Sequence, residues 1–163
     1  MTVTDLAAFI RDRARHVTNG TDTSSLIEFG VPRMHYESQD TFSGTVSCCL
    51  DWRAEIHLSA LDAHPEAPDV VAGFVEFLVL QLGEQPVAEL LDLYGPKAAA
   101  FTELFEGPWL APDLDEAEDF ADGMPIHAVL LVLDAAADPS LEPRGRLRPW
   151  AVSQVAHTML PTT

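Results

Sequence analysis

The feature that most constrains the fold is a strict alternation of apolar and polar residues between positions 42 and 60. Apolar or small side chains, such as Trp52 and Ile56, occupy every even position, while most odd positions carry polar side chains such as Arg53. Successive side chains of a β-strand point to opposite faces of its sheet, so this period predicts β structure with one buried face. Because a two-residue hairpin loop would invert the parity, either one long bent strand or a hairpin with an odd-length loop near Asp51 is expected.

Two further runs, residues 70–82 and 126–133, are apolar at nearly every position. A strand that is covered on both faces of its sheet has this pattern, and the first run is therefore predicted to be a central strand. Shorter apolar stretches at 26–29 and 34–36 are predicted to be two more short strands.

Three segments have the spacing of apolar residues that is typical of helices. Residues 4–17 predict a short amphipathic helix, and residues 86–105 predict a longer one. We expect the longer helix to be kinked or split at Gly95 and Pro96, because proline cannot donate a hydrogen bond inside a helix. The last helix is predicted to have Pro149 at its first position, where a missing N–H group costs nothing.

This order of elements predicts the α/β class, and more narrowly an α+β fold: a mixed, mostly antiparallel sheet with helices packed on it. A chain of 163 residues, 47% of them hydrophobic, is typical of one compact domain, so residues 1–163 are predicted to form a single domain. The adjacent Cys48 and Cys49 are poorly placed for an ordinary disulfide, and the sequence has neither a signal-peptide pattern nor a membrane span. These features predict a soluble cytoplasmic protein with no membrane partner.

The net charge of −17 arises from 26 acidic and 9 basic residues. Such a charge repels phosphate backbones, which excludes a general nucleic-acid-binding role and favours amines or basic partners. The charge is uneven: residues 1–17 carry +1 and residues 144–163 carry +3, so the residues between them carry −21. Between Phe101 and Glu142 there are 11 acids and no base, and three arginines follow within five residues.

The segment with these arginines combines an apolar strand, a turn and a helix. The amides at a helix N-terminus, with arginines beside them, form a setting that suits pyrophosphate or another anion. The alternative is that the arginines only neutralise the acids that precede them.

Residues 126–160 contain the sequence VLLVLDAAADPSLEPRGRLRPWAVSQVAHTML. This stretch resembles the central strand, pyrophosphate loop and following helix of the GNAT N-acetyltransferase superfamily. The resemblance implies a GNAT-like fold, acetyl-CoA as cofactor and acetyl transfer to a small-molecule amine. It also implies cofactor contacts at Leu133, Arg144, Gly145, Arg146 and Arg148. In that family another strand and helix follow the loop helix, so we expect a shortened cofactor cleft here unless a second subunit completes it in a homodimer.

An amine nucleophile must lose a proton during acetyl transfer, so a positioned base is required. Glu76 is one candidate, because it interrupts an apolar face where burial would raise the pKa of a carboxyl group. His127 and Asp134, at the two ends of the predicted strand, are the others. Each also has a structural interpretation: a polar sheet edge for Glu76, a strand end for His127 and a turn cap for Asp134.

The alternative function is that of a non-catalytic acidic binding or assembly protein that keeps a decayed GNAT-like fold. The acidic segment from Phe101 to Glu142 then forms either a solvated loop or a docking surface for a basic protein partner. No Cys and His spacing in the sequence is typical of a zinc site, so no metal is expected.

Overall fold

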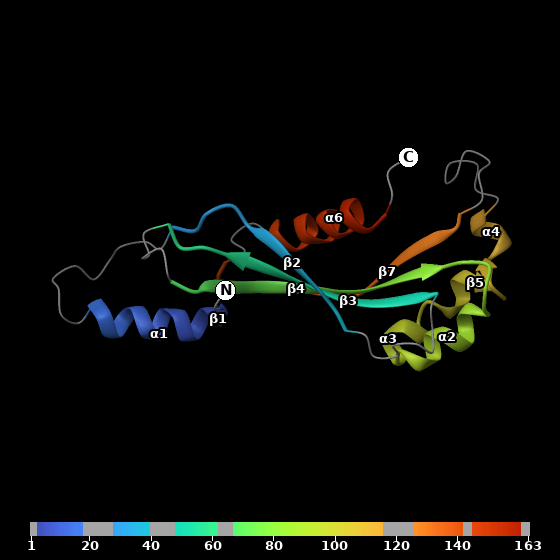
Figure 1. Ribbon diagram of the computed structural model, residues 1–163, viewed down its shortest axis with the longest axis horizontal. Helices are drawn as coiled ribbons and strands as arrows, with labels where there is room; N and C mark the ends of the chain where they lie inside the picture. Colours follow the sequence, from blue (N-terminus) through green and yellow to red (C-terminus); the bar gives the residue numbers. More distant parts are fainter. Residues whose placement is uncertain are drawn as a thin grey trace.

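The computed structural model describes residues 3–17, 28–39, 48–61, 67–115, 126–141 and 145–160. These residues form a curled, mostly antiparallel sheet of five strands, a small two-stranded sheet and helices packed against them (Figure 1). The predicted α+β class is therefore confirmed.

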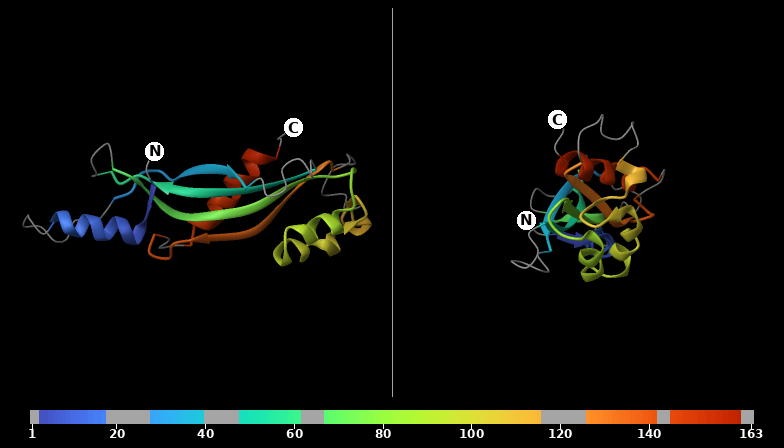
Figure 2. Two further views of the ribbon diagram at one scale, coloured as in Figure 1. Left: turned by 60° about the horizontal axis from the view of Figure 1, so that its bottom comes forward. Right: turned by 90° about the vertical axis from the view of Figure 1, so that its right-hand side faces the viewer.

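Strand β4 (Asp69–Gln81) is the centre of the main sheet, as its doubly apolar sequence predicts. On one side it pairs antiparallel with β3 (Cys49–Leu58), which in turn pairs antiparallel with β2 (Arg33–Ser38). On its other side it pairs in parallel with β1 (Val3–Asp5) and antiparallel with β7 (Ala128–Ala137). The borders of the sheet along most of its length are therefore β2 and β7, as Figure 2 shows.

The helices cover the two faces of this sheet at different places (Figure 1). Helix α6 (Leu147–Met159) packs on one face, where Ala151 and Val155 meet a fully buried cluster that includes Ile56 and Phe77. On the opposite face, at one end of the sheet, lie α2 (Val87–Leu93) and α3 (Pro96–Ala99). They are followed by the 3-10 turn η1 (Thr102–Leu104), the hairpin of β5 (Phe105–Glu106) and β6 (Trp109–Leu110), and α4 (Pro112–Asp115).

The described part of the alternating segment is a single strand, β3, which runs through Asp51 without a turn. The hairpin alternative is therefore wrong for residues 49–58, while positions 42–47 lie outside the described residues. The expected single buried face is also wrong at the ends of β3. Cys49 is buried and Leu50 is 47% exposed, because α2 and α3 cover the other face at that end.

Helix α1 (Leu6–Val17) confirms the first predicted helix, and it packs on the end of β4 through Leu6 and Phe9. The predicted break of the second helix is also confirmed. Gly95 has φ of 90° and separates α2 from α3, which begins at Pro96. A left-handed backbone of this kind favours glycine, since other residues pay a steric cost there.

Three boundaries differ from the sequence-based expectation. Helix α6 begins at Leu147, so Pro149 is its third residue; the first-turn N–H groups lack helical partners anyway, which makes proline acceptable there. The acidic segment from Phe101 to Glu142, predicted as a loop or docking surface, contains β6 and α4 among its described residues. Strand β7 continues to Ala137, so Asp134 lies inside the strand and does not cap its end.

No helix in the described ranges is long and apolar enough to cross a membrane.

Candidate functional site

Charged side chains gather on the sheet face opposite α6, where three strands place them in one row. Arg53 of β3 lies opposite Glu76 of β4, and Glu76 lies opposite Asp134 of β7. The Arg53 guanidinium donates a 2.7 Å hydrogen bond to Glu76 and lies 4.1 Å from the centre of the Phe74 ring. Two of the three predicted bases, Glu76 and Asp134, therefore meet on one surface.

Lys97 of α3 reaches this row from the helical side. Its Nζ donates a 2.5 Å hydrogen bond to Asp134 and lies 3.7 Å from Glu76. This hydrogen bond holds the pKa of Asp134 below its ordinary range and, for the same reason, raises the pKa of Lys97. The sequence did not point to Lys97, because 37 residues separate it from Asp134 and only the fold brings them together.

This arrangement is unfavourable for proton abstraction by Asp134. A general base works best when its pKa lies near the operating pH, and a lowered pKa makes the carboxylate a weaker base. Glu76 is half-buried and shares its two carboxylate oxygens between Arg53 and Lys97. Both carboxylates are therefore ion-paired within the chain.

His127 lies away from this row, exposed and directly before β7, which agrees with a residue at a strand end. Its backbone carbonyl accepts a 2.9 Å hydrogen bond from the N–H of Leu82. The structure brings the imidazole to neither Glu76 nor Asp134.

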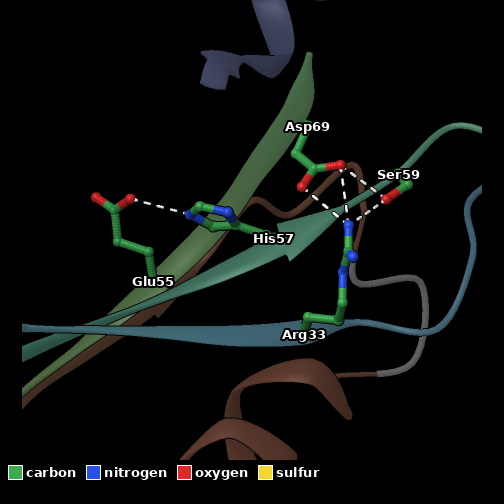
Figure 3. Close-up of polar contacts among 5 residues, drawn as sticks. All are labelled: Arg33, Glu55, His57, Ser59 and Asp69. Carbon is green, nitrogen blue, oxygen red and sulfur yellow. Dashed lines mark hydrogen bonds and ion pairs between the residues drawn. The ribbon is translucent and has the colours of Figure 1, made fainter. Parts of the chain in front are cut away.

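The same sheet face continues toward the start of β4, where a second polar group lies that sequence reasoning missed (Figure 3). The carboxylate of Asp69 has 5% of its side chain exposed and accepts hydrogen bonds from Arg33 at 2.9 Å and Ser59 at 2.7 Å. Arg33 also donates to the Ser59 hydroxyl at 2.6 Å. Since the members come from β2, the end of β3 and β4, only the strand register assembles them.

His57 forms a further contact on this face (Figure 3). Its Nε2 lies 3.2 Å from Glu55, and its ring stacks on that of His35 with 5.3 Å between the centroids. The alternation predicts an exposed polar position, yet His57 is 6% exposed. The His35 ring, which stacks on it, and the Glu55 side chain cover His57 on this face.

The predicted cofactor residues fall into two places. Gly145 has φ of 59°, Arg146 is the N-cap of α6 and Arg148 lies in its first turn, and all three are exposed. Leu133 packs against the core beneath α2 and α3, on the opposite face of the sheet from α6. The register of β7 against β4 passes over Leu133, which marks a β-bulge. Arg144 lies outside the described residues.

The helical end of the molecule, residues 82–115, concentrates exposed acids and exposed apolar side chains. We call it the acidic end. Four large apolar side chains are more than a third exposed there: Leu93, Leu104, Trp109 and Leu114. The exposed acidic residues of the same segment are Glu84, Glu89, Asp92, Glu103, Glu106 and Asp113. Lys97 is its one basic residue, and this lysine pairs with Asp134 and Glu76.

The two cysteines offer no reactive thiol. Both are free and buried beneath α2, and burial raises the pKa of Cys49 to about 11. The thiolate is the reactive form of cysteine, so a raised pKa makes Cys49 inert at neutral pH. Within the described ranges, no three His, Cys, Asp or Glu side chains are grouped so as to hold a metal ion.

No family model, curated protein or solved structure matches this chain. Function is therefore inferred from the side chains and their arrangement.

Proposed function

We propose that this chain is a non-catalytic binding protein whose acidic end docks a basic protein partner. The observation that carries the proposal is the exposure of Leu93, Leu104, Trp109 and Leu114 among six exposed acids. Exposed apolar side chains within a polar surround are typical of protein interaction sites. Acidic side chains around them attract a cationic partner and repel an anionic one.

The ion pairs of the charged row on the sheet also support a non-catalytic role. Its carboxylates, Glu76 and Asp134, form ion pairs with Arg53 and Lys97 inside the chain. Cross-strand pairs of opposite charge stabilise a sheet. We therefore assign the row a structural role.

A pair of designed peptides tests the binding proposal. The first is an amphipathic helix with leucines on one face and lysines on the other; the second has glutamate in place of every lysine. Calorimetric titration at low and high salt is expected to show binding of the lysine peptide alone, weakening as salt rises because the charges are screened. Equal affinity for both peptides, or no binding of either, would contradict the proposal.

Matched variants locate the binding surface. Leu93→Gln removes an apolar side chain that is 54% exposed in the acidic end, and it is expected to weaken binding of the lysine peptide. Val31→Gln makes the same kind of change before β2, at a side chain that is 84% exposed. This variant should bind the lysine peptide with the same affinity as the unmodified chain. Equal losses in the two variants would place the contact outside the acidic end.

Acetyl-CoA-dependent transfer to an amine is our second candidate. The observation that favours it is the pair of exposed arginines, Arg146 and Arg148, at the start of α6. Calorimetry with acetyl-CoA tests it: binding that weakens when both arginines are replaced by alanine would support it. No detectable binding at millimolar acetyl-CoA would end this proposal.

We propose the cytoplasm as the compartment of this chain. The support is that Cys48 and Cys49 are both free thiols, and free cysteines are typical of reducing compartments. A fluorescent fusion followed through cell fractionation tests the assignment, and recovery outside the cytoplasmic fraction would contradict it.

A further inference from the structure

The outer edge of β7 is the longer of the two borders of the sheet. Among the residues that the structure describes, β7 pairs with β4 alone. It is ten residues long, and Asp134 is its one charged residue. The other border, β2, is six residues long and carries Arg33 and Glu37. Charges and short length protect an edge strand from pairing with another chain, and β7 is longer than β2 and carries one charge where β2 carries two.

The backbone of β7 presents N–H groups along this edge that do not face β4. The carbonyl of His127 accepts a hydrogen bond from Leu82, directly after β4, and the N–H of Asp138 donates one to Ala72 of β4. Because the bonding direction alternates along an antiparallel strand, the N–H groups of Leu130 and Val132 point away from β4. These groups are available to a further strand.

Opposite charges lie at the two ends of β7. Its first residues adjoin the acidic end, because Leu82 bonds to His127 and the next exposed acid is Glu84. After its last residue the chain leads to Arg146 and Arg148 at the start of α6, which packs over β7 (Figure 1). Helix α6 itself contains no acidic residue.

We propose that a second copy of this chain pairs its β7 antiparallel with the outer edge of β7, forming a two-fold symmetric dimer. Antiparallel pairing places the end of one β7 beside the start of the other. The arginines of each copy therefore lie toward the acidic end of its partner, and the symmetry repeats this attraction twice.

The charge distribution favours pairing of two copies through the β7 edge over other contacts between them. A net charge of −17 makes most surfaces of the chain repel a second copy. The edge of β7 differs, because Asp134 is paired with Lys97 and the neighbouring α6 carries arginines. The proposal does not rest on peptide binding at the acidic end, so the two can fail independently.

Sedimentation equilibrium of the full chain tests the proposal with two variants that change the net charge equally. Arg146→Gln with Arg148→Gln removes two positive charges beside β7. Ser38→Glu with Gln39→Glu adds two negative charges at the exposed end of β2, on the opposite border. We expect the unmodified chain to dimerise, and the arginine variant to dissociate at least about tenfold more readily than the β2 variant.

Amide hydrogen exchange supplies the second measurement, and it does not depend on any variant. The amides of Leu130 and Val132 are expected to exchange more slowly as the protein concentration rises, because a partner strand protects them. A chain that stays monomeric overturns the proposal. So does a dimer in which these two amides exchange at the monomer rate, or one that both double variants weaken equally.

Discussion

Lys97 shows how one residue decides the chemistry of its neighbours. Glu76 and Asp134 attract attention in the sequence as single carboxyl groups among apolar residues. In the structure, the Lys97 ammonium group lies between them, 2.5 Å from Asp134 and 3.7 Å from Glu76. A pair of candidate bases thereby becomes a surface ion-pair network.

Replacing Lys97 with methionine is expected to raise the pKa of Asp134 toward its ordinary range, since the charge and hydrogen bond that lower it are lost. Titration of the Asp134 carboxyl by carbon NMR measures this shift. The arginine variant at position 97 keeps the charge and should leave the pKa lowered. An Asp134 pKa that is the same with methionine and with lysine would contradict the assignment.

The ion pair between Lys97 and Asp134 also makes the stability of the fold depend on pH. Because the pKa of Asp134 is lower in the folded chain, its contribution is present above the ordinary carboxyl pKa and is lost as the pH falls through the lowered value. We therefore expect the difference in unfolding free energy between the unmodified and methionine chains to shrink in acid. Urea unfolding at several pH values measures it, and a difference that grows in acid would be inconsistent with this sign.

Arg33 is expected to contribute more to the stability of the fold than an ordinary surface arginine. Its replacement by alanine leaves the buried Asp69 carboxylate with Ser59 as its remaining side-chain partner in Figure 3. Since Arg33 is itself 56% exposed, we expect a loss of about 1–2 kcal/mol in unfolding free energy, below the value for a fully buried pair. Arg11→Ala, at an exposed position of α1, should cost less than about 0.5 kcal/mol. Equal losses would show that Asp69 does not depend on Arg33.

At the scale of elements, the periodicity of the sequence was a sound guide to element type. Strand β4, helix α1 and the break between α2 and α3 are all predicted by it. It was a poor guide to burial in β3, where Cys49 is covered and Leu50 is exposed. Alternation shows that two faces differ, but which of them is covered depends on helices far away in the sequence.

The pairing of β4 with β7 depends on Gly73. A Cβ atom at this position would lie 2.2 Å from the backbone oxygen of Ala136, which is far inside van der Waals contact. We expect Gly73→Ala to lower the unfolding free energy by about 2–3 kcal/mol, because backbone must move to make room.

Gly107→Ala is the matched control for this substitution. Gly107 has φ of 59° with nothing within 4 Å of an added Cβ, so only backbone strain opposes the change. The expected cost is about 1 kcal/mol. Chemical denaturation of both variants measures the two losses of unfolding free energy. A larger loss for Gly107→Ala than for Gly73→Ala would show that the β4–β7 contact can relax.

At the scale of the whole molecule, two core clusters share one strand. Leu78 and Leu80 of β4 belong to the cluster under α2, while Val75 and Phe77 belong to the cluster under α6. Loss of order in β4 would therefore open both clusters together. We therefore expect the described part of the chain to unfold as one cooperative unit.

Matched core truncations test that cooperativity. Leu91→Ala in the first cluster and Ile56→Ala in the second each remove a fully buried side chain, and each is expected to cost about 2–5 kcal/mol. Both variants should unfold in one transition, with the same midpoint by circular dichroism and by tryptophan fluorescence. Separate transitions for the two probes would show that the acidic end unfolds on its own.

The sequence by itself determined the local elements, because side-chain periodicity and the backbone limits of glycine and proline act between near neighbours. It also determined the uneven charge, and it singled out Glu76 as a carboxyl group within an apolar face and Asp134 as one at a predicted strand end. Only the tertiary structure decided that Lys97 neutralises them, that Arg33 meets Asp69 and that β7 lies at a border of the sheet. These facts depend on strand register and on which helix covers which face, and contacts between residues distant in sequence set both.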